Sequence, residues 1–432
     1  MSALARYYLS IWYVVIWSDT TTSKLIEDLQ KEGAYIALWE HPGSIDESFE
    51  WVVYSEAIDP SHPERISAVH QKVPCLSYPQ ALGEITKNFE LVSIAGTHGK
   101  STTTAMLSLI LKETSLNFFS IVGTLVPEFW GKNFFTRKNL DDNECYFILE
   151  SCEYKESFLN YRPKIWVVTN IEADHLDYYK NIDNYIEAFQ KFLSNIRPWG
   201  FAVINMEDDL SKKLKKDRTD ISYVEMYHDY YLWCGESYNY RNIQMQIPGD
   251  HILTDAKLAY VAWFLCNAKP EEILSWLHAY KGTWRRMEIV GITPNKNILM
   301  SDYGHHPTEI LVTTKAIKER YPDKKLFCIF QPHQYSRTLE LLEDFKKCFS
   351  YCDTVVVPNI YASRDTKENM EKISAQSFVE QLSIKNKVFW NGLENTLSII
   401  KKYDLEEPGS SVILLMGAWD IDGLRTQIWT IK

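Results

Sequence analysis

Residues 91–112 combine an apolar run, a short glycine loop and a helix-like segment, and this order restricts the chain to few folds. The run Leu91-Val92-Ser93-Ile94 leads into Gly96-Thr-His-Gly-Lys-Ser101, and Thr102–Lys112 has a helical pattern. A strand that enters a helix through a glycine loop is typical of α/β folds with a mostly parallel sheet. Because loop N–H groups and a helix N-terminus attract anions, the segment also predicts a phosphate site.

The glycine loop differs from the common Walker A loop. A Walker A loop has its first glycine five residues before the glycine of Gly-Lys, and that position is Ile94 in this chain. The shorter spacing Gly-x-x-Gly-Lys-Ser also arises by chance, but its place between a strand and a helix favours a nucleotide phosphate. We then expect Lys100 to reach the terminal phosphates and the Ser101 hydroxyl to hold Mg²⁺.

Composition limits the class of protein. A chain of 432 residues predicts two or three domains. Its net charge of −11 argues against a broad nucleic-acid face, since phosphate binding needs clustered cations. The apolar stretch Tyr7–Trp17 is too short to span a bilayer, so we expect a helix that leads into a strand. Scattered cysteines indicate a reducing compartment, and we expect a cytoplasmic protein that binds neither nucleic acid nor membrane.

Three α/β domains are expected, at residues 1–88, 89–283 and 284–432. The first contains the helical patterns Thr22–Gly33 and Pro63–Lys72 and the strand patterns Ala34–Leu38 and Phe49–Tyr54. The central domain adds three strands to the one before the glycine loop: Tyr146–Leu149, Ile165–Thr169 and Phe201–Ile204. The third repeats strands and helices as a second Rossmann-like domain does. Its expected elements are strands Ile298–Met300, Leu326–Phe330, Thr354–Pro358 and Val412–Met416 and helices Thr308–Arg320 and Leu339–Phe349.

Polar side chains follow two of the central strands. Glu150 ends the first, and Asn170, Asp174 and His175 follow the second. Strand carboxyl ends line the ligand crevice of a parallel sheet, so Glu150 is a plausible Mg²⁺ ligand beside the loop. A lone histidine is usually structural, but the clustering favours a functional His175.

Two loops of the third domain carry aromatic and basic groups. They are Asp302-Tyr-Gly-His-His-Pro307 and Gln331-Pro-His-Gln-Tyr-Ser-Arg337. A dyad of paired histidines is conceivable there, but no serine or cysteine nucleophile motif accompanies it. The pair Arg285-Arg286 could bring cations to a phosphate when domains close.

In combination, these segments resemble the ATP-dependent Mur ligases of peptidoglycan synthesis over nearly the whole chain. The segments that carry the resemblance are Gly96–Thr104, Glu150–Leu159, Thr169–His175, Gly282–Arg286, Ser301–Glu309, Phe330–Thr338 and Met416–Ile421. Their order and spacing make chance very unlikely. The His-His-Pro and Gln-Pro-His loops resemble the alanine-adding members more than the D-glutamate-adding or diamino-acid-adding ones.

The resemblance implies three domains that bind a UDP group, bind ATP and close over nucleotide and amino acid, in chain order. It implies ATP-dependent ligation of L-alanine to the lactyl carboxylate of UDP-N-acetylmuramate through an acyl phosphate, with Mg²⁺ as the metal. A monomer or homodimer is expected. Two alternatives stay open: a ligase that recycles a whole tripeptide onto the same sugar nucleotide, and a relative that binds nucleotide without ligating.

The resemblance also implies roles for individual residues. Lys100 would hold the β- and γ-phosphates, Ser101 and Glu150 one Mg²⁺, and His175 a second. His251 would pack on adenine, Asp302 would bond the ribose and Arg286 would meet the γ-phosphate. Tyr303, His305 and Arg337 would face the acyl phosphate and the incoming alanine. The whole expected nucleotide set is Gly96, Thr97, His98, Gly99, Lys100, Ser101, Thr102, His251, Asp255, Arg286, Asp302 and Tyr303.

The chain departs from the family pattern in three places. The family's uridine-diphosphate loop ends in a Gly-Met-Ser-Ala-Leu-Ala sequence, whereas this chain begins Met1-Ser-Ala-Leu-Ala5, so we expect a truncated N-terminal domain. Asp255 stands where the family has an adenine-contacting asparagine, which puts that amide contact in doubt. Gln334 replaces a family arginine and removes one cation near the substrates.

Tryptophan is frequent and glycine is scarce. The chain has 14 tryptophans and only 17 glycines, about half the usual glycine share. Tryptophan stands where the family commonly has glycine at positions 12, 17, 39, 130, 166, 284 and 419. One interpretation is an aromatic-rich protein. The sharper hypothesis is that the source organism reads UGA as glycine, and the codons at these positions test it.

Overall fold

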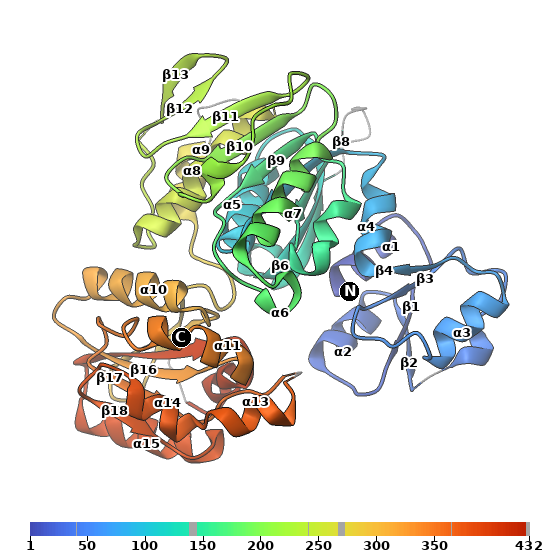
Figure 1. Ribbon diagram of the computed structural model, residues 1–432. Coiled ribbons are helices and arrows are strands. Elements are labelled where there is room, and N and C mark those ends of the chain that lie inside the picture. Colours follow the sequence, from blue (N-terminus) through green and yellow to red (C-terminus); the bar gives the residue numbers. More distant parts are fainter. Residues whose placement is uncertain (40, 138–144, 241, 267–272, 364, 429–432) are drawn as a thin grey trace. The chain divides into compact units, whose positions relative to one another are not determined.

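A computed structural model describes residues 1–39, 41–137, 145–240, 242–266, 273–363 and 365–428. Its contacts divide the chain into two compact units (Figure 1). Unit 1 comprises Met1–Ile243 with Thr254–His278, and unit 2 comprises Gln244–Leu253 with Ala279–Lys432. Helix α8 (Asp250–Leu265) contributes residues to both. The expected domain boundaries after residues 88 and 283 stay predictions.

Unit 1 is built on a mixed, mostly parallel nine-stranded sheet, counted over the described residues. In spatial order its strands are β13 (Glu236–Asn239), β12 (Tyr230–Trp233), β11 (Ser222–Met226), β10 (Phe201–Asn205), β9 (Ile165–Val168), β5 (Glu90–Ala95), β8 (Cys145–Glu150), β6 (Asn117–Val126) and β7 (Lys132–Arg137). The inner strands β11 to β6 run parallel, and β12, β13 and β7 are antiparallel additions. The three expected central strands are confirmed as β8, β9 and β10, and the expected α/β class is confirmed.

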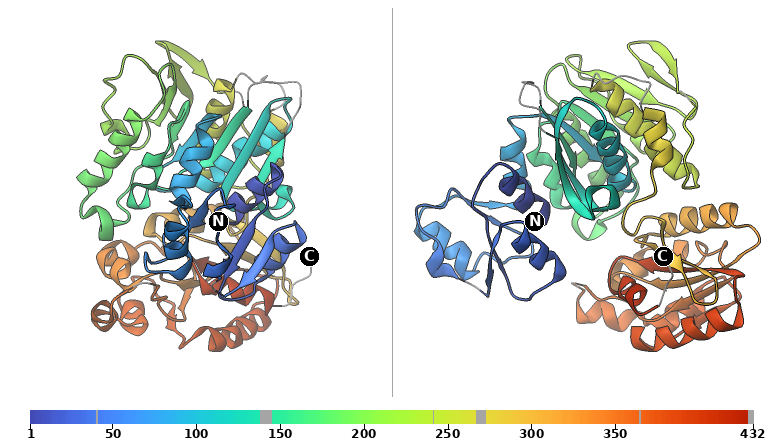
Figure 2. Two further views of the ribbon diagram at one scale, coloured as in Figure 1. Left: turned by 90° about the vertical axis from the view of Figure 1, so that its right-hand side faces the viewer. Right: turned by 180° about the vertical axis from the view of Figure 1, so that it is seen from behind.

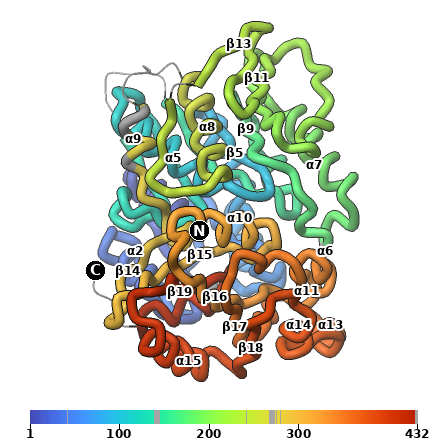
Figure 3. The backbone as a smooth tube through the Cα atoms, turned by 90° about the vertical axis from the view of Figure 1, so that its left-hand side faces the viewer, coloured from blue at the N-terminus to red at the C-terminus, as the bar shows by residue number. Residues whose placement is uncertain are grey.

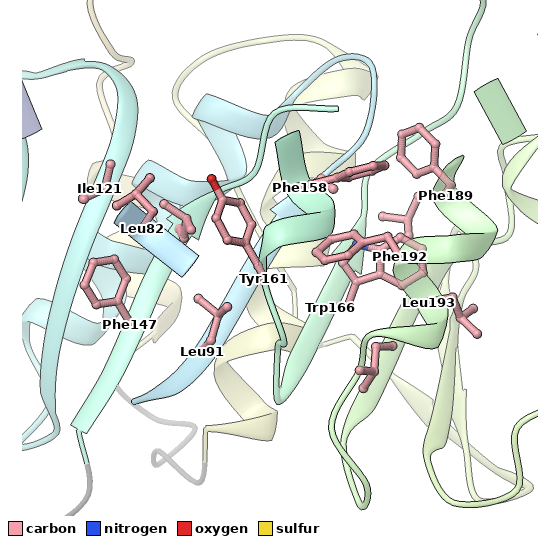
Figure 4. Packing of buried hydrophobic residues seen from close by; sticks show 14 of the residues in the cluster. Leu82, Leu91, Ile121, Phe147, Phe158, Tyr161, Trp166, Phe189, Phe192 and Leu193 are labelled. Atoms are coloured by element: carbon pink, nitrogen blue, oxygen red, sulfur yellow. The ribbon is translucent and has the colours of Figure 1, made fainter. Parts of the chain in front are cut away.

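Helices cover both faces of this sheet. Figure 3 shows α5 (Lys100–Lys112) and α8 on one side of β5 and β9, and α7 (Ile182–Ser194) on the other. On the α7 side Phe189 and Phe192 pack against Trp166 of β9 and Phe158 (Figure 4). The ring centroids of Phe158 and Phe192 are 4.6 Å apart, and all four side chains are fully buried. This aromatic core fixes β9 beside β5, and so fixes the strand end that carries the glycine loop.

The first 88 residues form a small α/β region within unit 1. Helix α1 (Ser2–Ser10) and strand β1 (Ile16–Asp19) confirm the expected helix that leads into a strand. Strand β1 pairs in parallel with β2 (Tyr35–Leu38), and β3 (Val52–Tyr54) pairs in parallel with β4 (Cys75–Ser77), as two separate sheets. Helices α2 (Lys24–Lys31), α3 (Pro63–His70) and α4 (Tyr78–Thr86) complete the region.

Unit 2 contains a six-stranded sheet in the described part of the chain. Its order is β14 (Glu288–Ile292), β15 (Ile298–Asp302), β19 (Ser411–Gly417), β16 (Lys325–Gln331), β17 (Thr354–Val357) and β18 (Lys387–Phe389), and only β14 is antiparallel. Helix α10 (Pro307–Arg320) covers one face and α15 (Leu393–Glu406) the other (Figures 1 and 2). The other α-helices of the described residues are α6 (Leu176–Tyr179) in unit 1, α9 (Ile273–Ala279) at the end of unit 1, and α11 (Tyr335–Glu340), α12 (Leu342–Phe345), α13 (Lys367–Lys372) and α14 (Ala375–Gln381) in unit 2.

One expected helix of unit 2 is wrong. The segment Leu339–Phe349 was expected to be a single helix, but α11 ends at Glu340 and α12 ends at Phe345. The break lies at Leu341, whose backbone (φ −100°, ψ 18°) is not helical. Phe345 and Phe349 are nevertheless both buried and pack near Phe330, so burial rather than one continuous helix explains the apolar spacing.

Candidate nucleotide and ligase site

The glycine loop joins β5 to α5, as the sequence predicts, with α5 beginning at Lys100. Gly96 and Gly99 both have left-handed backbone, with φ of 139° and 79°. A Cβ at Gly96 would lie 2.9 Å from the Asn170 carbonyl oxygen, so that approach also requires glycine. At these two positions the loop itself therefore adds no side chain in front of the N-terminus of α5.

The middle of the loop is held by the segment after β9. The Thr97 amide donates to the Asn170 carbonyl (3.0 Å), and the His98 amide donates to the Asn170 side chain (3.0 Å). Thr97 Oγ1 accepts from the Glu172 amide (2.9 Å), and His98 Nε2 lies 2.9 Å from the Glu172 carboxylate. Asn170 thus positions the loop rather than joining a ligand cluster with Asp174 and His175.

Lys100 turns back over the loop. Its ammonium group donates to the carbonyl oxygens of Gly96 (2.5 Å) and Thr97 (3.0 Å) and to Oε1 of Glu153 (3.1 Å). Burial would lower the pKa of Lys100, but the carboxylates of Glu153 and Glu150 and the nearby Cys152 together raise it. The lysine is therefore held fully charged at the loop.

Ser101 and Glu150 meet at the first turn of α5. The Ser101 hydroxyl donates to Oε1 of Glu150 (3.0 Å), and the Gly123 amide donates to Oε2 (2.6 Å). A Cβ at Gly123 would lie 2.6 Å from the Glu150 Cδ, so this glycine admits the carboxylate. The expected pairing of Ser101 with the glutamate at the end of β8 is thus present in the structure.

His175 is the N-cap of helix α6 (Leu176–Tyr179) and lies near Glu153, a carboxylate outside the predicted site. Its Nε2 atom lies 3.7 Å from Glu153 Oε1 and 3.7 Å from Asp174 Oδ2. Glu153 is 2% exposed and links His175 to Lys100. The signal that could have found it is a second glutamate three residues after Glu150.

Helix α8 carries two further expected residues, one beside the glycine loop and one in unit 2. Asp255 lies against Gly99 in unit 1. His251, one helical turn earlier, belongs to unit 2 and lies beside Gly249. Burial lowers the pKa of His251 to about 4. Thr102, also in the expected nucleotide set, is buried in the first turn of α5.

In unit 2, Asp302 organises the end of β15. Its two oxygens accept from the amides of Met287 and Gly304, each at 2.7 Å, and burial raises its pKa. Arg286 lies over the ring of Tyr303, with its guanidinium carbon 4.9 Å from the ring centroid. Its Nη1 atom lies 3.8 Å from Oε1 of Glu309.

His305, His333 and Arg337 continue from Tyr303 as one row. The ring of His305 lies 5.4 Å from Tyr303 and 5.8 Å from His333, centroid to centroid, and Arg337 Nη1 is 3.3 Å from His333 Nδ1. The expected residues of the two loops in unit 2 therefore share one edge of its sheet. Glu309 and His333 were missed, although both stand within the matching segments. Of the histidines in the two loops, His306 is the N-cap of α10, whereas the rings of His305 and His333 contact each other, so a histidine dyad there stays a prediction.

Among the described residues, four tryptophans have left-handed backbone, which non-glycine residues seldom adopt. Trp12, Trp39, Trp130 and Trp199 have φ between 56° and 76° and are 68–95% exposed. Trp166, by contrast, is a fully buried strand residue packed on Phe192. Left-handed backbone therefore supports the hypothesis of recoded glycine at positions 12, 39, 130 and 199, and its absence gives the hypothesis no support at 17, 166, 284 and 419.

None of the described helices is both long enough and apolar enough to cross a membrane.

Three stretches of the chain match known families. Residues 1–90 match "Mur ligase family, catalytic domain", residues 94–259 match "Mur ligase middle domain", and residues 285–419 match "Mur ligase, glutamate ligase domain".

Two curated relatives are UDP-N-acetylmuramate–L-alanine ligases. The one from Clostridium acetobutylicum is 34% identical over 98% of this chain and 93% of its own length. The one from Acetivibrio thermocellus is 33% identical over 98% and 91%.

Solved structures share the fold. A UDP-N-acetylmuramate-alanine ligase from Thermotoga maritima superposes with a TM-score of 0.77 at 23% identity, over 99% of this chain and 95% of that one. A murein peptide ligase from Psychrobacter arcticus gives 0.70 at 18% identity, with the same coverage.

Proposed function

This chain belongs to the Mur ligase family, and on that premise we propose that it ligates L-alanine to the lactyl carboxylate of UDP-N-acetylmuramate, using ATP, in peptidoglycan precursor synthesis. The single observation that carries the proposal is the arrangement at the glycine loop. Where α5 begins, the Lys100 ammonium donates to the Gly96 carbonyl of the loop, and the Ser101 hydroxyl donates to the Glu150 carboxylate. The names of the relatives support alanine as the amino acid.

The reaction divides into two displacements. A lactyl carboxylate oxygen attacks the γ-phosphorus, the bond to the β–γ bridging oxygen breaks, and ADP leaves. The alanine amine then attacks the acyl carbon, phosphate leaves with the electrons of the C–O bond, and the nitrogen loses a proton to give the amide. Phosphoryl transfer needs positioning and charge neutralisation more than a protein nucleophile, which suits this set of residues.

Residues of unit 1 take the phosphates and the metal in this proposal. Lys100 binds the β- and γ-phosphates. Ser101 and Glu150 fit Mg²⁺ because both offer oxygen, and their 3.0 Å separation equals the spacing of adjacent ligands, about 3 Å, in an octahedral shell. His175 is assigned a second Mg²⁺. A bound Mg²⁺ would neutralise charge on the transferring phosphoryl group.

Residues of unit 2 take the remaining groups. Arg286 binds the γ-phosphate, His251 packs on adenine and Asp302 bonds the ribose. Tyr303, His305 and Arg337 orient the acyl phosphate and the amine. Asp302 supports this role because each of its oxygens makes only one backbone contact in the structure and so keeps a lone pair for a hydroxyl donor.

Phosphate release and amide formation by the purified chain test the proposal. With ATP, Mg²⁺ and UDP-N-acetylmuramate, we expect phosphate and a new amide when L-alanine is added, and neither without it. Turnover with a tripeptide but not with alanine would identify the recycling ligase. Nucleotide binding without phosphate release under any condition would identify the non-catalytic alternative.

A further inference from the structure

We infer that Glu153 is a counter-ion which Lys100 must leave in order to bind the nucleotide. In the protein without nucleotide, the Lys100 ammonium is therefore held by the Glu153 carboxylate, and this ion pair is called the latch below. The inference concerns a positioning residue and rests on the proposed assignment of the glycine loop to ATP. Its evidence is the donor count at Lys100 and the burial of Glu153.

A lysine ammonium group has three N–H donors. In Lys100 one donor goes to each of the carbonyl oxygens of Gly96 and Thr97, and the third goes to Glu153. No donor is left for a phosphate oxygen. The two carbonyls belong to the rigid loop, whereas Glu153 is a side chain, so Glu153 is the partner that an incoming phosphate replaces.

The ion pair of Lys100 and Glu153 is strong because both side chains are shielded from water. The Lys100 and Glu153 side chains are 14% and 2% exposed, and the ammonium nitrogen lies 3.0 and 3.1 Å from the two carboxylate oxygens. Only Oε1 is in hydrogen-bonding geometry, and Oε2 is a buried oxygen with no hydrogen-bond partner among the described residues. Charge-assisted bonds of this kind are about twice as strong as neutral ones.

The surroundings of Glu153 hold its backbone while its carboxylate changes partner. The Tyr179 hydroxyl donates to the Glu153 carbonyl oxygen, and His175 Nε2 lies 3.7 Å from Oε1. Lys155 and Glu156, two and three residues further on, have left-handed backbone, with φ of 53° and 56°. When Lys100 leaves, Glu153 therefore stays beside His175 and does not follow the lysine to the phosphates.

The latch predicts that a substitution at Glu153 raises the affinity for ATP, whereas most substitutions in a binding site lower affinity. In Glu153→Gln the lysine is held by a neutral acceptor, so a non-hydrolysable ATP analogue should bind about five- to tenfold more tightly. AMP, which has no β- or γ-phosphate, should bind with unchanged affinity. Release of the latch should not raise kcat, so a lower KM for ATP without a higher kcat is expected.

Fluorescence titration with the ATP analogue and with AMP, both with Mg²⁺ present, measures the effect. Glu156→Gln is the matched control, because it removes an equal charge three residues away on a side chain that is 32% exposed, and it should leave both affinities unchanged. Glu153→Asp, whose shorter side chain cannot keep the 3.0 Å contact, should also tighten binding, and it replaces Glu153→Gln if that variant does not fold.

Weaker or unchanged binding of the ATP analogue by a folded Glu153 variant would overturn the latch. Ligase turnover is a separate measurement, since binding is titrated without UDP-N-acetylmuramate or alanine. If the wild-type chain makes no amide, the proposed function is refuted. Tighter binding of the ATP analogue by Glu153→Gln would still support the latch in that case.

Discussion

Asp255 lies so close to Gly99 that a Cβ on residue 99 would come 3.0 Å from the aspartate Cγ. The contact puts a buried carboxylate against the loop that is proposed to hold the phosphates. Gly99 has left-handed backbone and precedes Lys100 directly, so the aspartate stands at the N-terminus of α5, where anions are attracted. Bound phosphates would share that position with a negative charge.

Replacing Asp255 with asparagine should therefore strengthen ATP binding. The Asp255→Asn change keeps the shape of the side chain and removes one charge, and we expect the KM for ATP to fall about three- to tenfold. Steady-state kinetics with varied ATP measure it. Asp209→Asn, a charge removed from a side chain that is 92% exposed, is the control and should change nothing. A higher KM for Asp255→Asn would mean that the carboxylate itself binds the nucleotide.

The Ser101–Glu150 pair predicts that variants of either residue need more Mg²⁺ for activity. Ser101→Ala and Glu150→Gln each remove one proposed Mg²⁺ ligand, so half-saturation should need about tenfold more Mg²⁺ and kcat should fall about 10²-fold. Titration of activity with Mg²⁺ is the measurement. Ser108→Ala lies two turns further along α5, where the hydroxyl contacts Thr104 and Ser120, and should affect stability but not the Mg²⁺ requirement. Equal Mg²⁺ curves for all variants would remove the pair from the metal site.

Arg286 should be needed as a guanidinium group and not only as a charge. Arg286→Lys keeps the charge but loses the planar fork and its position over the Tyr303 ring, so we expect kcat to fall about 10²-fold. Arg320→Lys, at the end of α10, is the matched control and should retain activity. Kinetics with saturating substrates decide the point, and wild-type kcat in Arg286→Lys would refute the phosphate assignment.

His251 should stabilise the fold only while it is neutral. Burial lowers its pKa from 6.5 to about 4, so the folded protein binds fewer protons than the unfolded chain in this range. The stability that depends on the neutral ring is complete above pH 6.5 and falls as the pH drops towards 4. Urea unfolding at pH 7.5 and 5 should show a larger loss for the wild type than for His251→Gln, and the opposite order would contradict the burial of the ring.

The exposed tryptophans that have left-handed backbone should be replaceable by glycine without loss of stability. Left-handed backbone costs a non-glycine residue about 1–2 kcal/mol, while glycine lowers stability through the unfolded state by about 0.4–1 kcal/mol. Trp12→Gly and Trp199→Gly should therefore leave the free energy of unfolding unchanged or raise it by up to about 1.6 kcal/mol. The buried control Trp166→Gly should lose about 3–5 kcal/mol. Codons other than UGA at 12 and 199 would end the recoding hypothesis for those positions.

Much of the fold and of the site could be predicted because the signals are local. The strand–loop–helix around Gly96 and the apolar strands β8, β9 and β10 follow from short patterns. Partners distant in sequence could not be predicted. Glu153 looked like a polar loop residue, and only the fold places its carboxylate on Lys100, 53 residues away. Likewise, nothing local in the run Leu339–Phe349 marks the break at Leu341.

The tryptophans with left-handed backbone have a practical consequence for expression of this protein. The first of them is residue 12, before the first strand of the chain. If its codon is UGA, an expression host whose release factor recognises UGA would terminate translation directly before residue 12, and residues 12–432 would not be made. A recoded synthetic gene would then be the condition for obtaining any full-length enzyme from such a host.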